Sequence, residues 1–189
     1  MGVVQKCRRF SRFAKTRQVF CSFSIVTLVG LLGASPDRIQ VVAMVGDRAL
    51  TTRQLHLELV LESQKLGPFS EAEKRSAIER LVLQEMVAEE NRLTGLPQPD
   101  AKRIQAELLK TQRGLGKSWA SFVSRFGWRD SEWNQSIAKR LAVEDALLLR
   151  VQASRSTGPV SDVLRDWNDQ LRTRYRVRML EWESAASGF

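Results

Sequence analysis

Cysteine and histidine are scarce in this sequence of 189 residues, and their scarcity excludes several kinds of chemistry. The two cysteines, Cys7 and Cys21, lie near the N-terminus, so the chain beyond residue 35 can form no disulfide. Because His56 is the single histidine, a zinc site would have to be built from carboxylates. Ser/His/Asp and Cys/His catalytic sets cannot be assembled either, unless His56 carries every proton transfer. We therefore expect no metal site, no cofactor and no enzymatic activity, and we expect His56 at the surface or boundary of a helix.

Phosphate-binding and paired-carboxylate motifs are also missing. The segment GLGK at 114–117 lacks the spacing of a phosphate loop, and no predicted strand precedes it. Glu89 and Glu90 are adjacent in sequence, as are Glu144 and Asp145, so each pair should diverge around a helix and be solvated. Neither pair is expected to face one substrate.

Positive charge is concentrated at the front of the chain. The formal net charge is +9, but six of the 30 basic residues and none of the 21 acidic residues lie in residues 1–35. The remaining residues, 36–189, therefore carry 24 basic and 21 acidic groups, a net charge of +3. That balance does not predict a phosphate-binding surface, and we expect no nucleic-acid partner.

The N-terminal segment has the pattern of an export signal. Its basic residues precede an apolar run at 19–34, and Ala34 is a small residue suited to cleavage. The run is shorter than the roughly 20 apolar residues of a membrane span. Leu32, three residues before the cut, is larger than usual there, so two interpretations stay open: a cleaved signal peptide at 1–35, or a membrane anchor through residues 17–34. Both predict the periplasm or cell envelope, with residues 36–189 as one domain.

From residue 36 onward the pattern is mostly helical, with short strands at both ends. An apolar β-branched run at 38–46 and a brief strand at 49–51 predict a hairpin, and alternation at 175–182 predicts a final strand. Between them, helices are predicted to begin at Thr51, Ser70, Asp100, Ser118, Asp130 or Ser131, and Val160. The stretch 153–159 is the best candidate for an internal linker.

Local signals define several helix ends and buried stripes. Thr51 with Gln54, and Ser70 with Glu73, have the spacing of capping boxes, and Gly95 and Gly127 are at C-cap positions. Ser118 is expected to cap its helix, and the helix from Asp100 is expected to run through Arg113. Two apolar stripes at helical spacing predict core positions: Ile78, Leu81, Val82, Met86 and Leu93 on one helix, and Trp133, Ile137, Leu141, Leu148 and Val151 on another.

The order of these parts resembles the N-terminal chaperone domain of the SurA family of periplasmic folding factors, which is related to the non-catalytic part of PrsA-like foldases. Leu50-Thr51 stands where the family has a hydrophobic residue and Thr before its first helix. The second-helix pattern and the start of the last helix also match, at Ile78, Leu81, Val82, Met86, Gly95 and Val160-Ser161-Asp162. Glu89 or Glu90 stands where the family usually has Ala. The resemblance covers residues 39–182.

The resemblance implies a mainly α fold with a small β-sheet, in which the N-terminal hairpin pairs with the C-terminal strand, 41–45 against 176–180. It also implies a chaperone that holds unfolded or extended polypeptides, with outer-membrane proteins among its possible clients. A parvulin-type prolyl isomerase domain usually follows the final strand in this family. Only seven residues follow Trp182, so we expect no isomerase domain and no isomerase activity.

Aromatic residues are the most distinctive feature of the chain. Trp119, Phe122, Phe126, Trp128 and Trp133 fall within fifteen residues. Phe122, Phe126 and Trp167 lie on inward stripes and are expected in the core, whereas Trp128, in a turn beside a glycine, is equally suited to an exposed peptide-binding surface. The candidate polypeptide-binding residues are therefore Trp128, Trp133, Trp119 and Phe126.

Two functions from different classes remain open. A holdase would bind many unfolded chains weakly, whereas an envelope assembly or structural subunit would use the same fold to bind one dedicated partner tightly. The sequence favours the holdase through its resemblance to the SurA family. It contains no signal for the oligomeric state.

Overall fold

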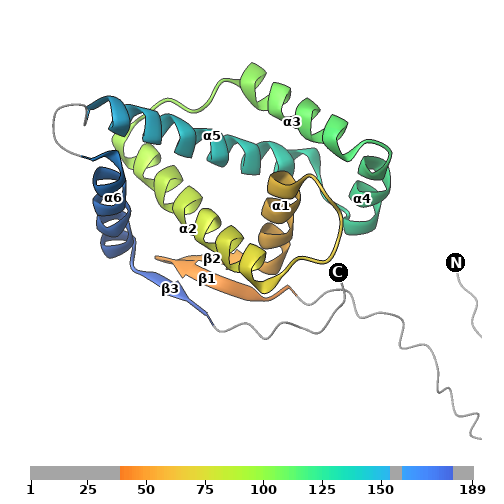
Figure 1. Cartoon of the computed structure of the whole chain (residues 1–189), viewed down its shortest axis with the longest axis horizontal. Coiled ribbons are helices and arrows are strands. Elements are labelled where there is room, and N and C mark those ends of the chain that lie inside the picture. Colours follow the sequence, from red (N-terminus) through yellow and green to blue (C-terminus); the bar gives the residue numbers. More distant parts are fainter. Residues whose placement is uncertain (1–38, 154–158, 181–189) are drawn as a thin grey trace, which may run out of the picture. The chain divides into compact units, whose positions relative to one another are not determined.

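Helices dominate the part of the chain that the computed structural model describes, residues 39–153 and 159–180 (Figure 1). The mainly α fold with a small sheet is confirmed. The signal peptide or anchor at 1–35, most of the linker and Trp182 lie outside the described residues. The elements, in chain order, are β1 (Val41–Val45), β2 (Arg48–Thr51), α1 (Thr52–Ser63), α2 (Glu71–Thr94), α3 (Ala101–Leu115), α4 (Ser118–Phe126), α5 (Asp130–Ala153), α6 (Val160–Tyr175) and β3 (Val177–Met179).

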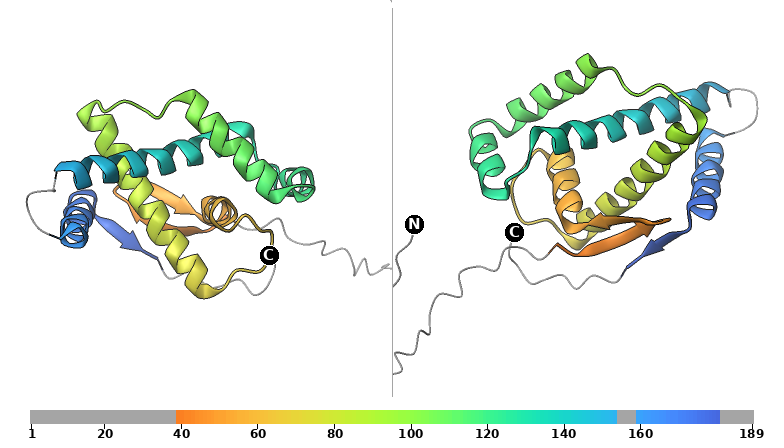
Figure 2. Two further views of the ribbon diagram at one scale, coloured as in Figure 1. Left: turned by 45° about the horizontal axis from the view of Figure 1, so that its top comes forward. Right: turned by 180° about the vertical axis from the view of Figure 1, so that it is seen from behind.

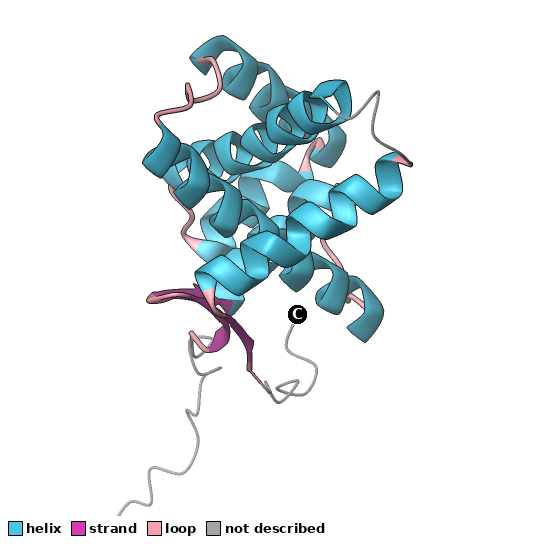
Figure 3. Cartoon of the chain, turned by 90° about the vertical axis from the view of Figure 1, so that its left-hand side faces the viewer, coloured by secondary structure: helices cyan, strands magenta, loops and turns pink. Residues whose placement is uncertain are grey.

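The three strands form an antiparallel sheet in the order β2-β1-β3, as predicted. Gly46, at φ 58°, makes the tight turn between β1 and β2, and its N–H donates to the carbonyl of Tyr175 at 2.7 Å. On the other side of β1, Ala43 lies opposite Met179 and Val45 lies opposite Val177. The end of the described chain is thus paired with its beginning. Figure 3 shows that the helices lie on one side of the strands.

Side-chain caps fix the starts of the first two helices, as the sequence predicts. Both capping boxes form, Thr51 with Gln54 and Ser70 with Glu73. Gly95 and Gly127 end α2 and α4 in the left-handed conformation. These local hydrogen bonds are formed by residues close in sequence, which is why the boundaries could be predicted.

Some predicted boundaries are wrong. The final strand begins at Val177 rather than at residue 175, because Tyr175 is still part of α6 and Arg176 ends that helix in the left-handed conformation. Ser118 does not cap α4; the cap position is Lys117, and the N–H of Trp119 instead donates to the carbonyl of Gly116 at 3.2 Å. The backbone therefore provides what a serine side chain was expected to provide. Helix α3 continues beyond Arg113 to Leu115, because the glycine whose positive φ ends the helix is Gly116 and not Gly114.

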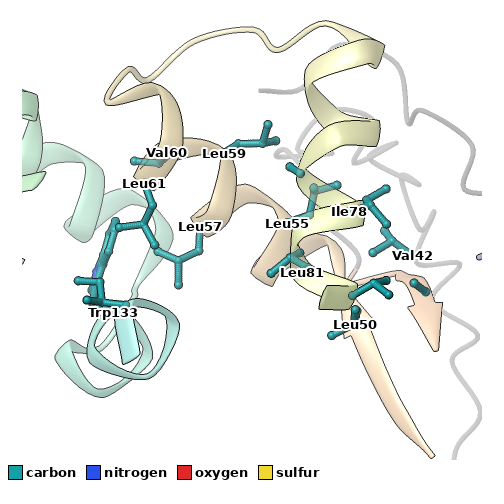
Figure 4. Close-up of a cluster of buried hydrophobic side chains, with 14 of the residues drawn as sticks. Val42, Leu50, Leu55, Leu57, Leu59, Val60, Leu61, Ile78, Leu81 and Trp133 are labelled. Atoms are coloured by element: carbon teal, nitrogen blue, oxygen red, sulfur yellow. The ribbon is translucent and has the colours of Figure 1, made fainter. Parts of the chain in front are cut away.

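The core surrounds α1. Every residue from Leu55 to Leu61 is buried, so the middle of this helix has no exposed face. In Figure 4, Leu55 lies on the side of Leu50 and Leu81, toward the sheet and α2, whereas Leu57 and Leu61 lie on the side of Trp133 in α5. Helix α1 therefore links two groups of apolar side chains, one at the sheet and one at α4 and α5.

Both apolar stripes predicted from the sequence include residues that the structure leaves outside the core. Ile78, Leu81, Val82 and Met86 are buried as predicted, but Leu93 is exposed. On α5 the same holds for Leu148, although Trp133, Ile137 and Leu141 are buried. Leu93 lies in the last turn of α2 and Leu148 in the last two turns of α5, so both lie toward a helix end and outside the core. Periodicity identifies the inward face of a helix but not how far its neighbours reach.

Helix α6 and β3 complete the fold on the side of α2 (Figure 2). Trp167 and Leu171 are buried, and the guanidinium carbon of Arg150 in α5 lies 5.0 Å from the centre of the Trp167 ring. The pairing of β3 with β1 holds the other end of this segment. Residues 160–180 thus contribute both apolar contacts and sheet hydrogen bonds.

We predict that removing residues 160–189 leaves an unstable fragment. The deletion exposes one edge of β1 and the apolar surfaces that cover Trp167 and Leu171. Thermal unfolding followed by circular dichroism should show a broad transition or none. A truncated chain that unfolds as cooperatively as the full chain would contradict this assignment.

Candidate functional site

The aromatic residues of α4 and the start of α5 form one cluster. The ring centroids of Phe122 and Trp128 are 4.6 Å apart, and those of Trp128 and Trp133 are 5.1 Å apart. Trp119 lies 4.6 Å from Trp133, and Phe126 stacks on Trp128 at 5.3 Å. The structure therefore brings all four candidate polypeptide-binding residues together, with Phe122 between them.

This cluster belongs to the core. Trp133 is fully buried and Trp128 is 4% exposed, while Trp119 and Phe126 are partly buried against the same core. Of the two positions left open for Trp128, the structure shows the buried one, so Trp128 does not lie exposed on a binding surface. Its position after Gly127 explains why: the left-handed glycine ends α4, and the Trp128 ring then packs on Phe126.

Two further aromatic side chains reach the cluster from other elements. His56 of α1 is buried, so its predicted place at a helix surface or boundary is wrong. Its ring centroid lies 4.5 Å from that of Phe126, 5.4 Å from that of Trp128 and 6.1 Å from that of Phe69. The sequence does contain a signal for this burial. Leucine and valine side chains surround His56 along α1, so the polar residues form no continuous stripe on this helix.

An arginine fastens the cluster to α1. Arg53 donates from Nε and Nη2 to the two carboxylate oxygens of Glu132 at 2.8 and 3.0 Å. It also donates to the carbonyls of Phe126 and Gly127, at 2.9 and 3.1 Å, at the C-terminus of α4. The hydrogen bond from Arg53 lowers the pKa of Glu132. A cavity of about 110 Å³ between Arg53 and Trp128 is bordered by this paired arginine and therefore offers no free guanidinium to a ligand.

We predict that Trp133→Ala destabilises the fold by about 3–5 kcal/mol, because it leaves a large cavity at the centre of the cluster. Leu148→Ala, on the same helix but 56% exposed, should change stability by less than about 0.5 kcal/mol. Urea unfolding at one pH compares the two variants. Equal losses from both would show that Trp133 does not carry the packing assigned to it.

A larger groove of about 380 Å³ lies between α1, α3 and α5. Leu61, Ile137 and Leu141 are apolar lining residues, and charged side chains border them. These charges are paired with each other: Arg140 donates to Glu62 at 2.8 Å, and Lys110 lies 3.3 Å from Glu107. The groove therefore presents no uncompensated charge that would select a ligand.

The adjacent acidic pairs are ion-paired rather than simply solvated. Glu144 and Asp145 do not diverge completely, because Arg103 donates to both, at 3.3 and 2.6 Å. Glu89 and Glu90 do diverge, but each has basic partners. Glu89 accepts from Arg48 and Arg92, whereas Glu90 accepts from Arg174 at 2.7 Å and from the hydroxyl of Tyr175 at 2.7 Å.

Glu85 is a buried acidic group of α2 that joins this helix to two other elements. It accepts a hydrogen bond from Arg48 of β2 at 2.5 Å and another from Lys139 of α5. Burial alone would raise the pKa of Glu85, but the hydrogen bonds and charges of Lys139 and Arg48 outweigh it, so the pKa lies below its ordinary value. The carboxylate is therefore charged in the folded chain and holds the sheet and α5 to α2.

We predict that Glu85→Gln lowers stability at neutral pH and flattens its dependence on acid. Because the folded-state pKa is lowered, the contribution of Glu85 is present above its unfolded pKa and is lost as the pH falls through the folded one. Urea midpoints measured from about pH 7 to about pH 3 should fall less steeply in the variant than in the parent chain. Parallel curves would contradict the role assigned to Glu85.

The outer edge of β3 is one of the two edges of the described sheet, where a strand presents backbone groups with no neighbouring strand. The N–H of Leu180 donates to the carbonyl of Val42 at 3.1 Å, so the backbone of residue 180 faces β1. Backbone groups alternate in direction along an antiparallel strand. The N–H and C=O groups of Val177 and Met179 therefore point away from the sheet.

The opposite edge of the sheet is less available. At β2 the N–H of Thr51 is occupied by the side chain of Gln54 at 2.9 Å, as part of the capping box of α1. The N–H of Thr52 faces the other way, toward β1, and donates to the carbonyl of Gln40 at 2.8 Å. The start of α1 thus occupies an outward N–H at the end of β2, whereas no such side-chain bond covers Val177 or Met179 in the described residues, and β3 is the more open edge.

Apolar side chains accompany the open edge. Met179 is 45% exposed and Leu180 is 39% exposed, and Ile39, before β1, and Val41, at its start, are also exposed. Arg178 is exposed between Val177 and Met179. None of these residues can be recognised as a binding site from the sequence, because edge position depends on the strand order and not on composition.

Comparisons with known proteins add no assignment. No family model matches the chain, and no curated protein or solved structure matches it either. In residues 39–153 and 159–180, no three His, Cys, Asp or Glu side chains gather where they could hold a metal ion. Among the helices of these same residues, none has the length and apolar character needed to cross a membrane.

Proposed function

We propose that this chain is an exported, chaperone-like protein of the cell envelope that binds unfolded or extended polypeptide segments and has no enzymatic activity. The open edge of β3 is the observation that carries the proposal. An extended segment can add there as a fourth strand, with hydrogen bonds to the outward backbone groups of Val177 and Met179. The basic and apolar N-terminal pattern supports export, and the resemblance to the SurA family supports a chaperone.

Backbone pairing suits a binding protein that must accept many sequences. Every residue except proline offers the same N–H and C=O groups, so the edge hydrogen bonds do not depend on side-chain identity. Each contributes only about 0.5–1.5 kcal/mol net, and two outward residues provide few of them. Met179 adds a flexible apolar surface that adapts to different side chains. The combination predicts weak and broadly tolerant capture.

The buried aromatic cluster has a supporting role in this proposal. It packs α4 and α5 against α1, and α1 follows the hairpin directly. The sheet is therefore attached to a rigid set of helices rather than to a loop. Binding energy at the edge does not have to order the sheet first.

The test is aggregation of an unfolded outer-membrane β-barrel protein, followed by light scattering with and without an equimolar amount of the full chain. We predict that the parent chain suppresses aggregation. Met179→Pro should lose this activity, because proline removes an outward N–H that an added strand needs. The fold should survive, since the N–H of Met179 does not face β1 and edge strands tolerate proline at such positions.

Met179→Val is the matched control, because it keeps the N–H and the apolar character of the edge. It should suppress aggregation as the parent chain does. Near-ultraviolet circular dichroism of the buried tryptophans verifies that each variant is folded. The proposal fails if the folded parent chain does not suppress aggregation, or if the folded proline variant does so equally well. Tight binding of one folded envelope protein instead would support a dedicated-partner subunit.

A further inference from the structure

We propose that the β3 edge selects extended segments in which an acidic residue lies between two apolar residues. The inference rests on the proposed function, because it specifies which segments the same edge prefers. It is carried by Arg178 and by the different surroundings of the two faces of the sheet. Arg178 lies between Val177 and Met179, the two residues whose backbone N–H and C=O groups point away from the sheet.

The two faces of β3 differ because only one faces the helices. Val177 and Met179 lie opposite Val45 and Ala43, both of which are buried, so these four residues share the face toward the helices. Arg178 lies opposite Met44 and therefore belongs to the other face. The strand thus presents an apolar, a basic and an apolar side chain in alternation.

Arg178 is available to a partner. Its side chain is exposed, and no carboxylate within the described ranges forms an ion pair with it. The nearby Arg172 and Arg174 differ in this respect, since they pair with Glu79 and Glu90 of α2. Those two arginines attach α6 to α2, whereas the charge of Arg178 is left without a counterion from the described fold.

An added strand would place one side chain directly beside Arg178. Since Val177 and Met179 offer the outward hydrogen bonds, an antiparallel addition makes Arg178 part of a pair that is not hydrogen-bonded, where side chains approach most closely. An acidic residue there forms a favourable cross-strand pair. The residues on either side of it lie beside Val177 and Met179 and are favoured to be apolar. The preferred pattern, an acidic residue between two apolar residues, reads the same from either end of the bound segment.

The same arginine disfavours a second copy of this chain as the occupant. Two β3 strands paired with Val177 opposite Met179 would bring Arg178 against Arg178, and like charges directly opposite each other destabilise a sheet. The observed charge therefore favours an acidic segment of another chain over edge-to-edge self-association.

Three peptides with identical threonine-rich flanks test the preference, with Val-Glu-Val, Val-Gln-Val or Val-Lys-Val at the centre. Fluorescence anisotropy of labelled peptides with the full chain at low salt should give the order Glu, Gln, Lys from tightest to weakest. Each step should be about two- to fivefold, as expected for one cross-strand charge pair. The differences should shrink at high salt, which screens exposed charges.

Arg178→Glu should reverse the order, so that the lysine peptide binds most tightly. Arg165→Glu is the matched control, because Arg165 is an exposed arginine on α6 that pairs with Asp162 of its own helix. It should leave the order unchanged. A parent chain that binds all three peptides equally, or an Arg178→Glu variant that keeps the parent order, would overturn the inference while the proposed function stands.

Failure of the proposed function gives a different result. In that case none of the three peptides binds, and neither Met179→Pro nor Arg178→Glu changes any signal. Sedimentation provides one further outcome: a dimer of the parent chain that dissociates in Met179→Pro would show that a second copy occupies the edge, and would overturn the acidic preference.

Discussion

The pairing of β3 with β1 is the contact on which the rest of this arrangement depends. Val45 and Val177 lie opposite one another although they are 132 residues apart in sequence. Closing so long a segment costs conformational entropy, which the helices between them must offset by burying apolar surface. The same pairing places α6 beside α2 and leaves β3 as an edge strand. Fold closure and the candidate binding edge therefore have one structural origin.

Charged side chains on α2 hold this closed arrangement in register. Glu85 bonds to β2 and α5, and Glu90 bonds to Arg174 and Tyr175 at the end of α6. Exposed ion pairs contribute little individually, but Glu85 is buried, and losing a partner of a buried charge is costly. With their counterions supplied inside the fold, these arginines and lysines are not free for ligands. Arg178 at the edge is the contrasting case, which gives the edge its chemical character.

Sequence reasoning succeeded where the determining interaction is local or strongly patterned. The capping boxes predicted where the helices after Thr51 and Ser70 begin. The alternation of apolar residues near the end of the chain predicted the final strand and, with the hairpin, the sheet. It failed where burial depends on neighbours distant in sequence. The sequence left the exposure of Trp128 open, and the boundary position predicted for His56 is wrong, because His56 of α1 packs against Phe126 and Trp128. Leu93 and Leu148 are exposed, since periodicity does not reveal where a helix extends past its neighbours. The binding edge could not be chosen from sequence, because it follows from the strand order.

Residue-specific amide hydrogen exchange tests the central claim most directly, because it observes the edge groups themselves. In the free chain the amide of Leu180, bonded to Val42, should be protected, while those of Val177 and Met179 should exchange rapidly. Adding an unfolded β-barrel polypeptide should slow exchange at Val177 and Met179 and leave Leu180 little changed. Protection of Met179 in the free chain, or no added protection when polypeptide is bound, would contradict strand addition at this edge.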